Sequence, residues 1–343
     1  MKEKLLFFSI KHPLLYILPL AIIVKILAAI FTDGWLTDIQ FNGFNNYTIP
    51  ESWMTNPWIV YISRLVLGAF SLLIITLAYR ITKIIADKTT ALEIAVFGAS
   101  LWAVPYVTVH PFASIVSLPF LLYGTLLIIK QHNLLDNNEL EKSHRTTFII
   151  AGFCLGLGFA VYYQSVIFYI GILATLLILK NWKGALMTLI GYIVAIGITQ
   201  TVVDLVVFHK PFVAITYFFQ DICNIRFTLS GISNNLESTG SFLLVLLVPP
   251  MSFLLLFGFF RVWRKYIILV LPTFIALLYT ILISNEVEVL LMTVPTYLIA
   301  GYVGWKEFYK KSAFWARNKW LVVTLYILFA LLNITLMVLM FFI

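Results

Sequence analysis

Long apolar runs alternate with short polar segments along almost the whole chain. A helix needs roughly 17–25 mostly apolar residues to cross the hydrocarbon core of a bilayer. The runs that reach or approach this length are 13–31, 57–79, 91–109, 111–129, 147–162, 165–179, 184–207, 241–260, 266–283, 289–305 and 320–342. The pattern therefore predicts an all-α polytopic membrane protein with about 11 transmembrane helices.

Proline, polar and small residues punctuate these runs. His110-Pro111 ends one predicted span and begins the next, and Gln164-Ser165 does the same. Pro249-Pro250 predicts a kink, or a late start of its span, because proline lacks a backbone N–H. Gly152 and Gly156 share one face of their helix, which predicts close packing against a neighbouring helix.

The composition agrees with a membrane environment. Apolar residues make up 62% of the 343 positions and charged residues only 11%, whereas soluble domains are about half apolar and about a quarter charged. We expect a single transmembrane domain over residues 1–343, without a soluble domain. The first apolar run is too long for a signal peptide and lacks a small-residue cleavage site, so we expect an uncleaved first span.

Lysine and arginine are distributed unequally between the two sides of the predicted bundle. With a cytoplasmic N-terminus, all but four of the 23 basic residues lie in cytoplasmic segments. The exceptions are Lys25 and Arg64 within spans, and Lys210 and Arg226 in outer loops. Because basic residues in short loops favour the cytoplasm, we expect a cytoplasmic N-terminus and an outer C-terminus. This topology accounts for the net charge of +8, and nucleic-acid binding is not expected.

The predicted outer side carries most of the candidate chemistry. Its larger loops cover about 32–56 and 208–240. Further acids lie at Glu286 and Glu288 in a short outer turn, and at Asp204 near the outer end of a span. The inner halves of the spans are almost purely apolar. This argues against a transporter, in which polar groups line a path near the middle of the membrane.

Metal and redox chemistry are not predicted. Cys154 lies in an apolar run and Cys223 in a polar loop, so we expect no disulfide. Two cysteines are too few for a cysteine-based metal site, and the histidines lack metal-ligand spacing. No phosphate-binding glycine loop or nucleophile elbow is present, and we expect no metal and no cofactor.

Two carboxylates follow the first span directly, at Asp33 and Asp38. A carboxylate at a membrane boundary is partly desolvated, which raises its pKa and suits it to act as a general base. The alternative is that both are solvated loop residues or helix caps.

Lys25 and Arg64 are costly where they stand, and a charge inside a span indicates a functional site. Arg64 lies roughly 10 Å below the outer boundary at about 1.5 Å per residue, and Lys25 lies at a similar depth. Both could reach an anionic headgroup or lipid phosphate. The alternatives are snorkelling towards the interface or pairing with a carboxylate such as Asp204.

Several outer-side residues occur in the order and spacing of a known family. They are Thr32-Asp33 or Thr37-Asp38-Ile39-Gln40 after the first span, Arg64 early in the second, Asp204 with Phe208 near the outer end of a middle span, and Glu286 in a late outer turn that Pro295 follows. In these features the chain resembles the GT-C class of membrane glycosyltransferases. It is most similar to the polyprenyl-phosphate-mannose-dependent mannosyltransferases of the GPI-anchor and N-glycan type.

The resemblance implies a reaction and a set of residues. Asp33 or Asp38 would be the base, and Arg64, Lys25 and Arg226 would bind the donor phosphate. Contacts to substrate would come from Gln40, Gln164, Asp204, Glu286 and Glu288. The chain departs from the family where Glu288 replaces an arginine and Tyr163 replaces an arginine before Gln164.

The residues and the resemblance together indicate two alternative functions. The first is transfer of a mannose-like hexose from a polyprenyl-phosphate sugar to a lipid or glycan acceptor at the outer face. The second is an inactive relative that binds a lipid-linked glycan or scaffolds a complex with a membrane protein partner. The compact size favours a bacterial inner membrane, where membrane lipids would surround the spans.

Overall fold

The computed structural model describes residues 14–31, 57–110, 112–136, 145–223, 229–283 and 286–342. Within these ranges the secondary structure is helical, without strands. The helices are α2 (Leu14–Phe31), α4 (Pro57–Ile85), α5 (Lys88–Ser100), α6 (Ala103–Val109), α7 (Ala113–Asp136), α8 (Arg145–Val161), α9 (Ser165–Ile178), α10 (Trp182–Phe208), α11 (Val213–Cys223), α12 (Leu229–Leu246), α13 (Met251–Arg261), α14 (Ile267–Leu282), α15 (Val287–Lys311), α16 (Ala313–Arg317) and α17 (Lys319–Phe342).

The helices are those of an integral membrane protein with several spans. By length and composition, five are apolar enough to cross a membrane, or up to seven if each bent pair forms one span. The five lie in α4, α7, α10, α15 and α17, and the bent pairs are α5 with α6 and α12 with α13. The remaining predicted spans coincide with shorter apolar helices in α2, α8, α9 and α14. The larger count of 11, the position of each terminus and the single domain stay predictions.

Two predicted spans are bent rather than straight. The axes of α5 and α6 differ by 65°, and those of α12 and α13 by 112°. The second bend falls at Pro249-Pro250, as the sequence predicts, because neither proline can donate to the preceding turn. At the first bend, Asn333 of α17 bonds to the backbone of Ser100 and Trp102, with distances of 2.7 and 2.9 Å.

Much of the predicted outer segment 208–240 is helical in the described residues. It contains α11 and the first turns of α12. The polar residues of α12 made this part of the sequence resemble a loop. They are compatible with a helix at the edge of a bundle, where one face meets water: Asn235, for example, donates to the carbonyl of Ile281 at 3.3 Å.

Glycine allows two helix pairs to approach closely. A Cβ atom on Gly152 would lie 1.9 Å from the carbonyl oxygen of Thr188, and one on Gly191 would lie 2.0 Å from that of Ile149. These glycines join α8 to α10, which confirms the close packing predicted for this face of α8. Gly258 plays the same part between α13 and α15, since its added Cβ would lie 2.0 Å from a backbone oxygen.

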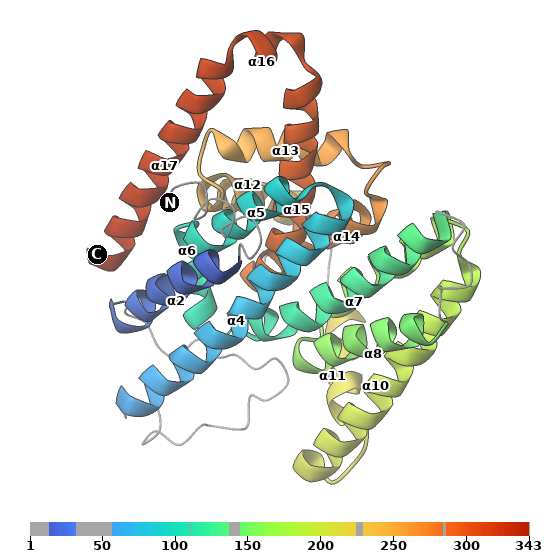
Figure 1. Cartoon of the computed structure of the whole chain (residues 1–343). Coiled ribbons are helices and arrows are strands. Elements are labelled where there is room, and N and C mark those ends of the chain that lie inside the picture. The colour runs from blue at the N-terminus through green and yellow to red at the C-terminus, as the bar shows by residue number, and fades with distance from the viewer. Residues whose placement is uncertain are drawn as a thin grey trace.

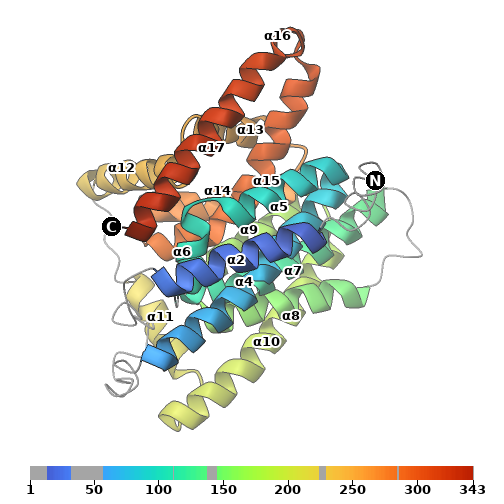
Figure 2. The same cartoon turned by 60° about the vertical axis from the view of Figure 1, so that its left-hand side comes forward.

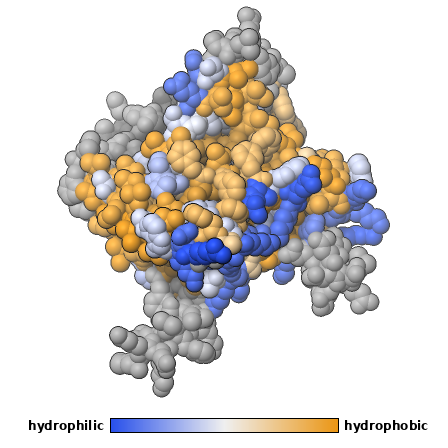
Figure 3. Space-filling model, turned by 90° about the horizontal axis from the view of Figure 1, so that it is seen from above, coloured by the Kyte–Doolittle hydropathy of each residue, from blue (hydrophilic) through white to orange (hydrophobic). Residues whose placement is uncertain are grey.

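The bundle has two chemically different ends. At one end lie the ion pairs Lys265–Glu307, Lys306–Glu93 and Lys310–Asp87, around the C-termini of α4 and α15. We call this the basic end. It gathers segments that the sequence places together in the cytoplasm. Figures 1 and 2 show α16 at this end, and Figure 3 shows hydrophilic residues gathered in a band across an otherwise hydrophobic surface. The opposite end, where α4 and α15 begin, is called the acidic end.

Candidate functional site

Four of the predicted site residues lie outside the described part of the chain. They are Asp33, Asp38, Gln40 and Arg226. Asp33, Asp38 and Gln40 follow α2 directly in the sequence, so the end of α2 marks where their segment begins. Their roles stay predictions.

Lys25 is buried in α2, with 5% of its surface exposed. Its ammonium group donates to the hydroxyl of Thr108 in α6 at 2.5 Å. That hydroxyl donates in turn to the carbonyl oxygen of Val104 at 2.7 Å. The alternative that Lys25 pairs with Asp204 is wrong, because in the described residues Asp204 bonds to the start of α11 instead.

Arg64 is also buried, with 7% of its surface exposed, and it lies beside Lys25 on the seam between α2 and α4. Its guanidinium group donates to the carbonyl oxygen of Ala29 at 3.1 Å. This carbonyl belongs to the last turn of α2, whose oxygens have no partner within the helix. One turn further along α4, Gly68 faces Lys25, since a Cβ there would lie 3.7 Å from the lysine Cβ. This register places both cations on the same seam between α2 and α4.

A groove of about 260 Å³ runs between α2 and α4 and is lined by both cations. Its other walls are apolar and include Ile22 and Ile26, each 41% exposed, and Leu65, 46% exposed. Buried positive charge repels a second cation and attracts an anion, and low local dielectric strengthens that attraction. The groove is therefore an apolar surface with two buried positive charges behind it, whose donors are turned to Thr108 and Ala29.

Glu288 lies at the first turn of α15 and serves another helix. Its carboxylate accepts from the backbone N–H of Ser114 at 3.0 Å, at the start of α7. A carboxylate at a helix N-terminus satisfies an unpaired N–H and interacts favourably with the helix dipole. This contact gives Glu288 a structural role at the start of α7.

The remaining predicted contacts form a second polar group at the acidic end. The side-chain amide of Gln164, between α8 and α9, donates to Glu286 at 2.8 Å. Asp204 is fully buried, and one of its oxygens accepts from the N–H of Ala214 at 3.2 Å. Its other oxygen has no hydrogen-bond partner in the described ranges.

Three polar residues at this end were not predicted from the sequence as members of a site. Tyr163 donates its hydroxyl to the side chain of Gln200 at 3.0 Å, and Thr108 holds Lys25. Gln200 precedes Asp204 by one helical turn, so the two side chains share one face of α10. This spacing is visible in the sequence and could have indicated that Gln200 lies near Asp204. Thr108 carries no such signal, because hydroxyls within spans commonly bond to their own helix.

The structure brings some predicted residues together and leaves others apart. Lys25 and Arg64 share one groove, and Gln164 is hydrogen-bonded to Glu286. Asp204 bonds to the start of α11. The two groups are linked through the turn between α6 and α7, because Thr108 meets Lys25 and Ser114 meets Glu288.

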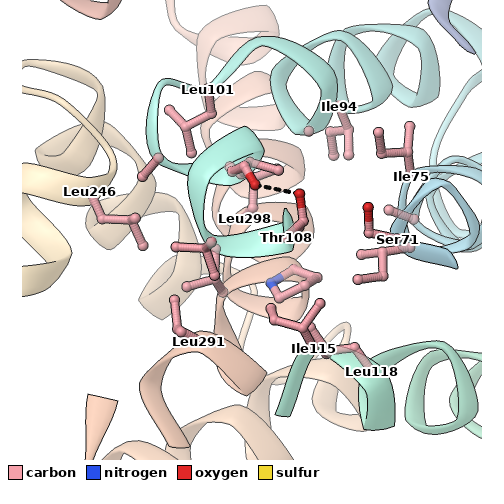
Figure 4. A pocket seen from close by; sticks show the side chains of 18 residues that line it. Ser71, Ile75, Ile94, Leu101, Thr108, Ile115, Leu118, Leu246, Leu291 and Leu298 are labelled. Atoms are coloured by element: carbon pink, nitrogen blue, oxygen red, sulfur yellow. Dashed lines mark hydrogen bonds between the residues drawn. The ribbon is translucent and has the colours of Figure 1, made fainter. Parts of the chain in front are cut away.

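A small apolar cavity lies behind Thr108 (Figure 4). It measures about 70 Å³ and is lined by residues of α4, α5, α6, α7, α12 and α15. Figure 4 shows Ile75, Ile94, Leu118 and Leu298 among the side chains around it, with the Thr108 hydroxyl in the same wall. An apolar cavity of this kind stays dry and accepts apolar groups.

Comparison with known proteins adds no family. No protein-family model matches the chain, and no curated protein matches it either.

Proposed function

We propose that the protein is a GT-C-like glycosyltransferase that moves a hexose from a polyprenyl-phosphate sugar to a lipid or glycan acceptor. The observation that carries this proposal is the groove between α2 and α4. It combines two buried cations with an apolar rim. A polyprenyl phosphate has the matching construction of one anionic group on an apolar chain. The proposed location is a bacterial inner membrane, with the site at the outer face.

The proposed reaction is an inverting substitution at the anomeric carbon. An acceptor hydroxyl attacks, its oxygen bonds to the anomeric carbon, and the bond from that carbon to the phosphate oxygen breaks. Asp33 or Asp38 takes the hydroxyl proton. Lys25 and Arg64 stabilise the negative charge that stays on the lipid phosphate, with Arg226 as a further candidate for this role. Confinement of the donor to the bilayer lowers the entropy cost of bringing the reactants together.

The test measures sugar transfer from radiolabelled polyprenyl-phosphate hexoses in inverted and right-side-out membrane vesicles. Lys25→Met and Arg64→Met are each expected to lower transfer by about 100-fold, the low end of the loss on removal of a charge-stabilising group. Lys83→Met, near the other end of α4, is the control and should keep full activity. Asp33→Asn or Asp38→Asn should abolish transfer while folded protein remains. Full activity in both aspartate variants would exclude this mechanism.

A second candidate function is a catalytically inactive subunit that binds a lipid-linked glycan or scaffolds a membrane complex. Internal contacts favour it, because Glu288, Asp204 and Gln164 each bond within the protein. Copurification separates the two functions. A stable stoichiometric membrane partner, with no transfer from any polyprenyl-phosphate sugar, would support the scaffold and refute the transferase.

A further inference from the structure

A second groove lies at the basic end of the bundle, and none of its lining residues belongs to α2 or α4. It is formed by α5, α15 and α17 and measures about 720 Å³. This lies within the range of about 300–1,000 Å³ that is typical of ligand sites. Figures 1 and 2 show α17 joined to α15 through α16 and diverging from it along its length.

Two polar contacts hold α17 beside this groove. Asn333 bonds to the backbone at the bend between α5 and α6, and the hydroxyls of Tyr302 and Tyr326 lie 3.0 Å apart. Elsewhere α17 is loosely packed. Of the apolar stretch of this helix that could cross the membrane, only 17% is buried inside the protein. The groove between these contacts is therefore bordered by a helix that faces the membrane.

The floor and the rim of the groove are apolar. Phe97 lies 5.2 Å from Tyr302 and 5.1 Å from Phe329, measured between ring centres. These rings form a buried floor, while the rim residues Val96 and Val323 are 43% and 57% exposed. A mostly apolar groove of this kind suits contact with an apolar lipid chain.

The groove ends among basic residues. Lys306 lines it and pairs with Glu93, and Lys310 pairs with Asp87 just beyond. Three more basic residues follow within the next helical segments, and their surfaces are exposed: Lys311, Arg317 and Lys319. Within the described residues none of these three forms an ion pair with a carboxylate, although the charge of Lys311 acts on Glu307 at longer range. This end therefore carries positive charge beyond what its own carboxylates neutralise.

We propose that this groove binds an anionic phospholipid of the surrounding leaflet. One acyl chain lies on the aromatic floor between α5, α15 and α17, and the phosphate lies among Lys311, Arg317 and Lys319. Anionic lipids bind clusters of basic residues at the membrane surface in this way. The site is separate from the proposed sugar-transfer site, and the lipid acts as a structural ligand that fixes α17 to the bundle.

The test uses the full-length protein purified in mild detergent, and native mass spectrometry counts bound lipid after incubation with phosphatidylglycerol or phosphatidylcholine of the same acyl chains. The wild-type protein should retain phosphatidylglycerol in preference and melt at a higher temperature in its presence. Equal retention of the two lipids would overturn the proposed anionic selectivity.

Two pairs of variants locate the site. Ala330→Trp fills the groove and should remove both the bound lipid and the thermal shift. Leu331→Trp is its control, because Leu331 is 60% exposed and does not line the groove. Equal retention by these two variants would refute the location.

The second pair tests the charge. Replacing Lys311, Arg317 and Lys319 together by glutamine should weaken binding by at least about five-fold, since one such residue near an anionic surface contributes about that factor. Replacing Arg145, Lys180 and Lys183 by glutamine removes the same charge from other segments of the chain and should leave binding unchanged. Equal losses in the two triple variants would show non-specific attraction to the surface and overturn the proposal.

Discussion

Single polar residues in this protein are satisfied by backbone groups that the helices leave unpaired. Arg64 bonds to a carbonyl in the last turn of α2, and Glu288 to an N–H at the start of α7. Asn333 does both, because it donates to the carbonyl of Ser100 and accepts from the N–H of Trp102. In a bilayer such backbone groups have no water to bind, so each of these side chains stabilises a helix end.

Asn333 provides a test of this principle. Asn333→Ala should leave the carbonyl of Ser100 and the N–H of Trp102 unpaired, and a buried group in that state costs about 1–3 kcal/mol. Thermal unfolding of purified protein in detergent measures the loss. Thr335→Val is the control on the same helix, because the Thr335 hydroxyl bonds only to its own helix, at Leu331. A variant as stable as the control would contradict the role of Asn333.

Asp87 gives the protein a pH dependence at its basic end. It begins α5 by accepting from the N–H of Thr90 at 2.6 Å, and it lies 2.8 Å from the Lys310 ammonium. Partial burial raises its pKa, but the hydrogen bonds from Lys310, Thr90 and Thr89 outweigh this, and the pKa of Asp87 is held well below its usual range.

The sign of the effect follows from linkage. The unfolded carboxyl group has a pKa of about 3.9, so ionised Asp87 stabilises the folded protein above about pH 4 and loses this effect as the pH falls further. The melting temperature of the wild-type protein should therefore decrease more between about pH 5 and pH 3 than that of Asp87→Asn. At neutral pH, Asp87→Ala should cost about 1 kcal/mol through loss of the helix cap, whereas asparagine keeps the cap. Identical pH profiles for wild type and Asp87→Asn would contradict this account.

At the scale of elements, glycine determines how closely helices pack. The α8–α10 and α13–α15 pairs approach so closely that backbone oxygens occupy the space of an added Cβ. Close backbone approach is a main source of helix association in membranes, because burying apolar surface there gives no hydrophobic gain.

Two glycines of α10 make a matched pair of variants. Gly191→Ala places a Cβ 2.0 Å from the carbonyl oxygen of Ile149, and we expect a loss of about 1–3 kcal/mol from overpacking. Gly197→Ala meets no atom within 4 Å, and should be neutral or stabilising by up to about 1 kcal/mol, because alanine favours the helix. Thermal melting in detergent distinguishes the two, and equal stability would contradict the close approach.

At the scale of the whole molecule, the basic and acidic ends are separated along the bundle. Segments expected in the cytoplasm meet through Lys306–Glu93 and Lys310–Asp87, and those expected outside meet through Gln164–Glu286 and Glu288–Ser114. The alternation of loops in the sequence and the spatial arrangement of the helices therefore agree on which segments share a side.

The direction of the bundle in the membrane is tested with α10, which is long enough to cross it. In a protein whose own Cys154 and Cys223 are replaced by serine, Lys183→Cys and Lys210→Cys place a thiol near each end of this helix. A membrane-impermeant maleimide should label Lys210→Cys in intact cells and Lys183→Cys only after permeabilisation. The reverse result would contradict the cytoplasmic N-terminus.

Local sequence was sufficient for the elements. Run length and hydropathy predicted helices in the right places, the breaks at His110-Pro111 and Gln164-Ser165, and the close-packing face at Gly152. These properties depend on neighbours a few positions apart, which the sequence displays directly. The sequence did not display the helices α11 and α12 within the segment 208–240, because polar side chains on a helix resemble those of a loop.

The sequence by itself determined that this chain is helical and apolar enough for a membrane, and that Lys25 and Arg64 stand out as charges within spans. Only the tertiary structure decided their partners. Lys25 meets Thr108 across 83 positions, and Arg64 meets Ala29 across 35. Such contacts depend on the register between helices, which is set by side-chain packing over the whole bundle. No local pattern contains that information, and for this reason the groove that supports the proposed function became visible only in the fold.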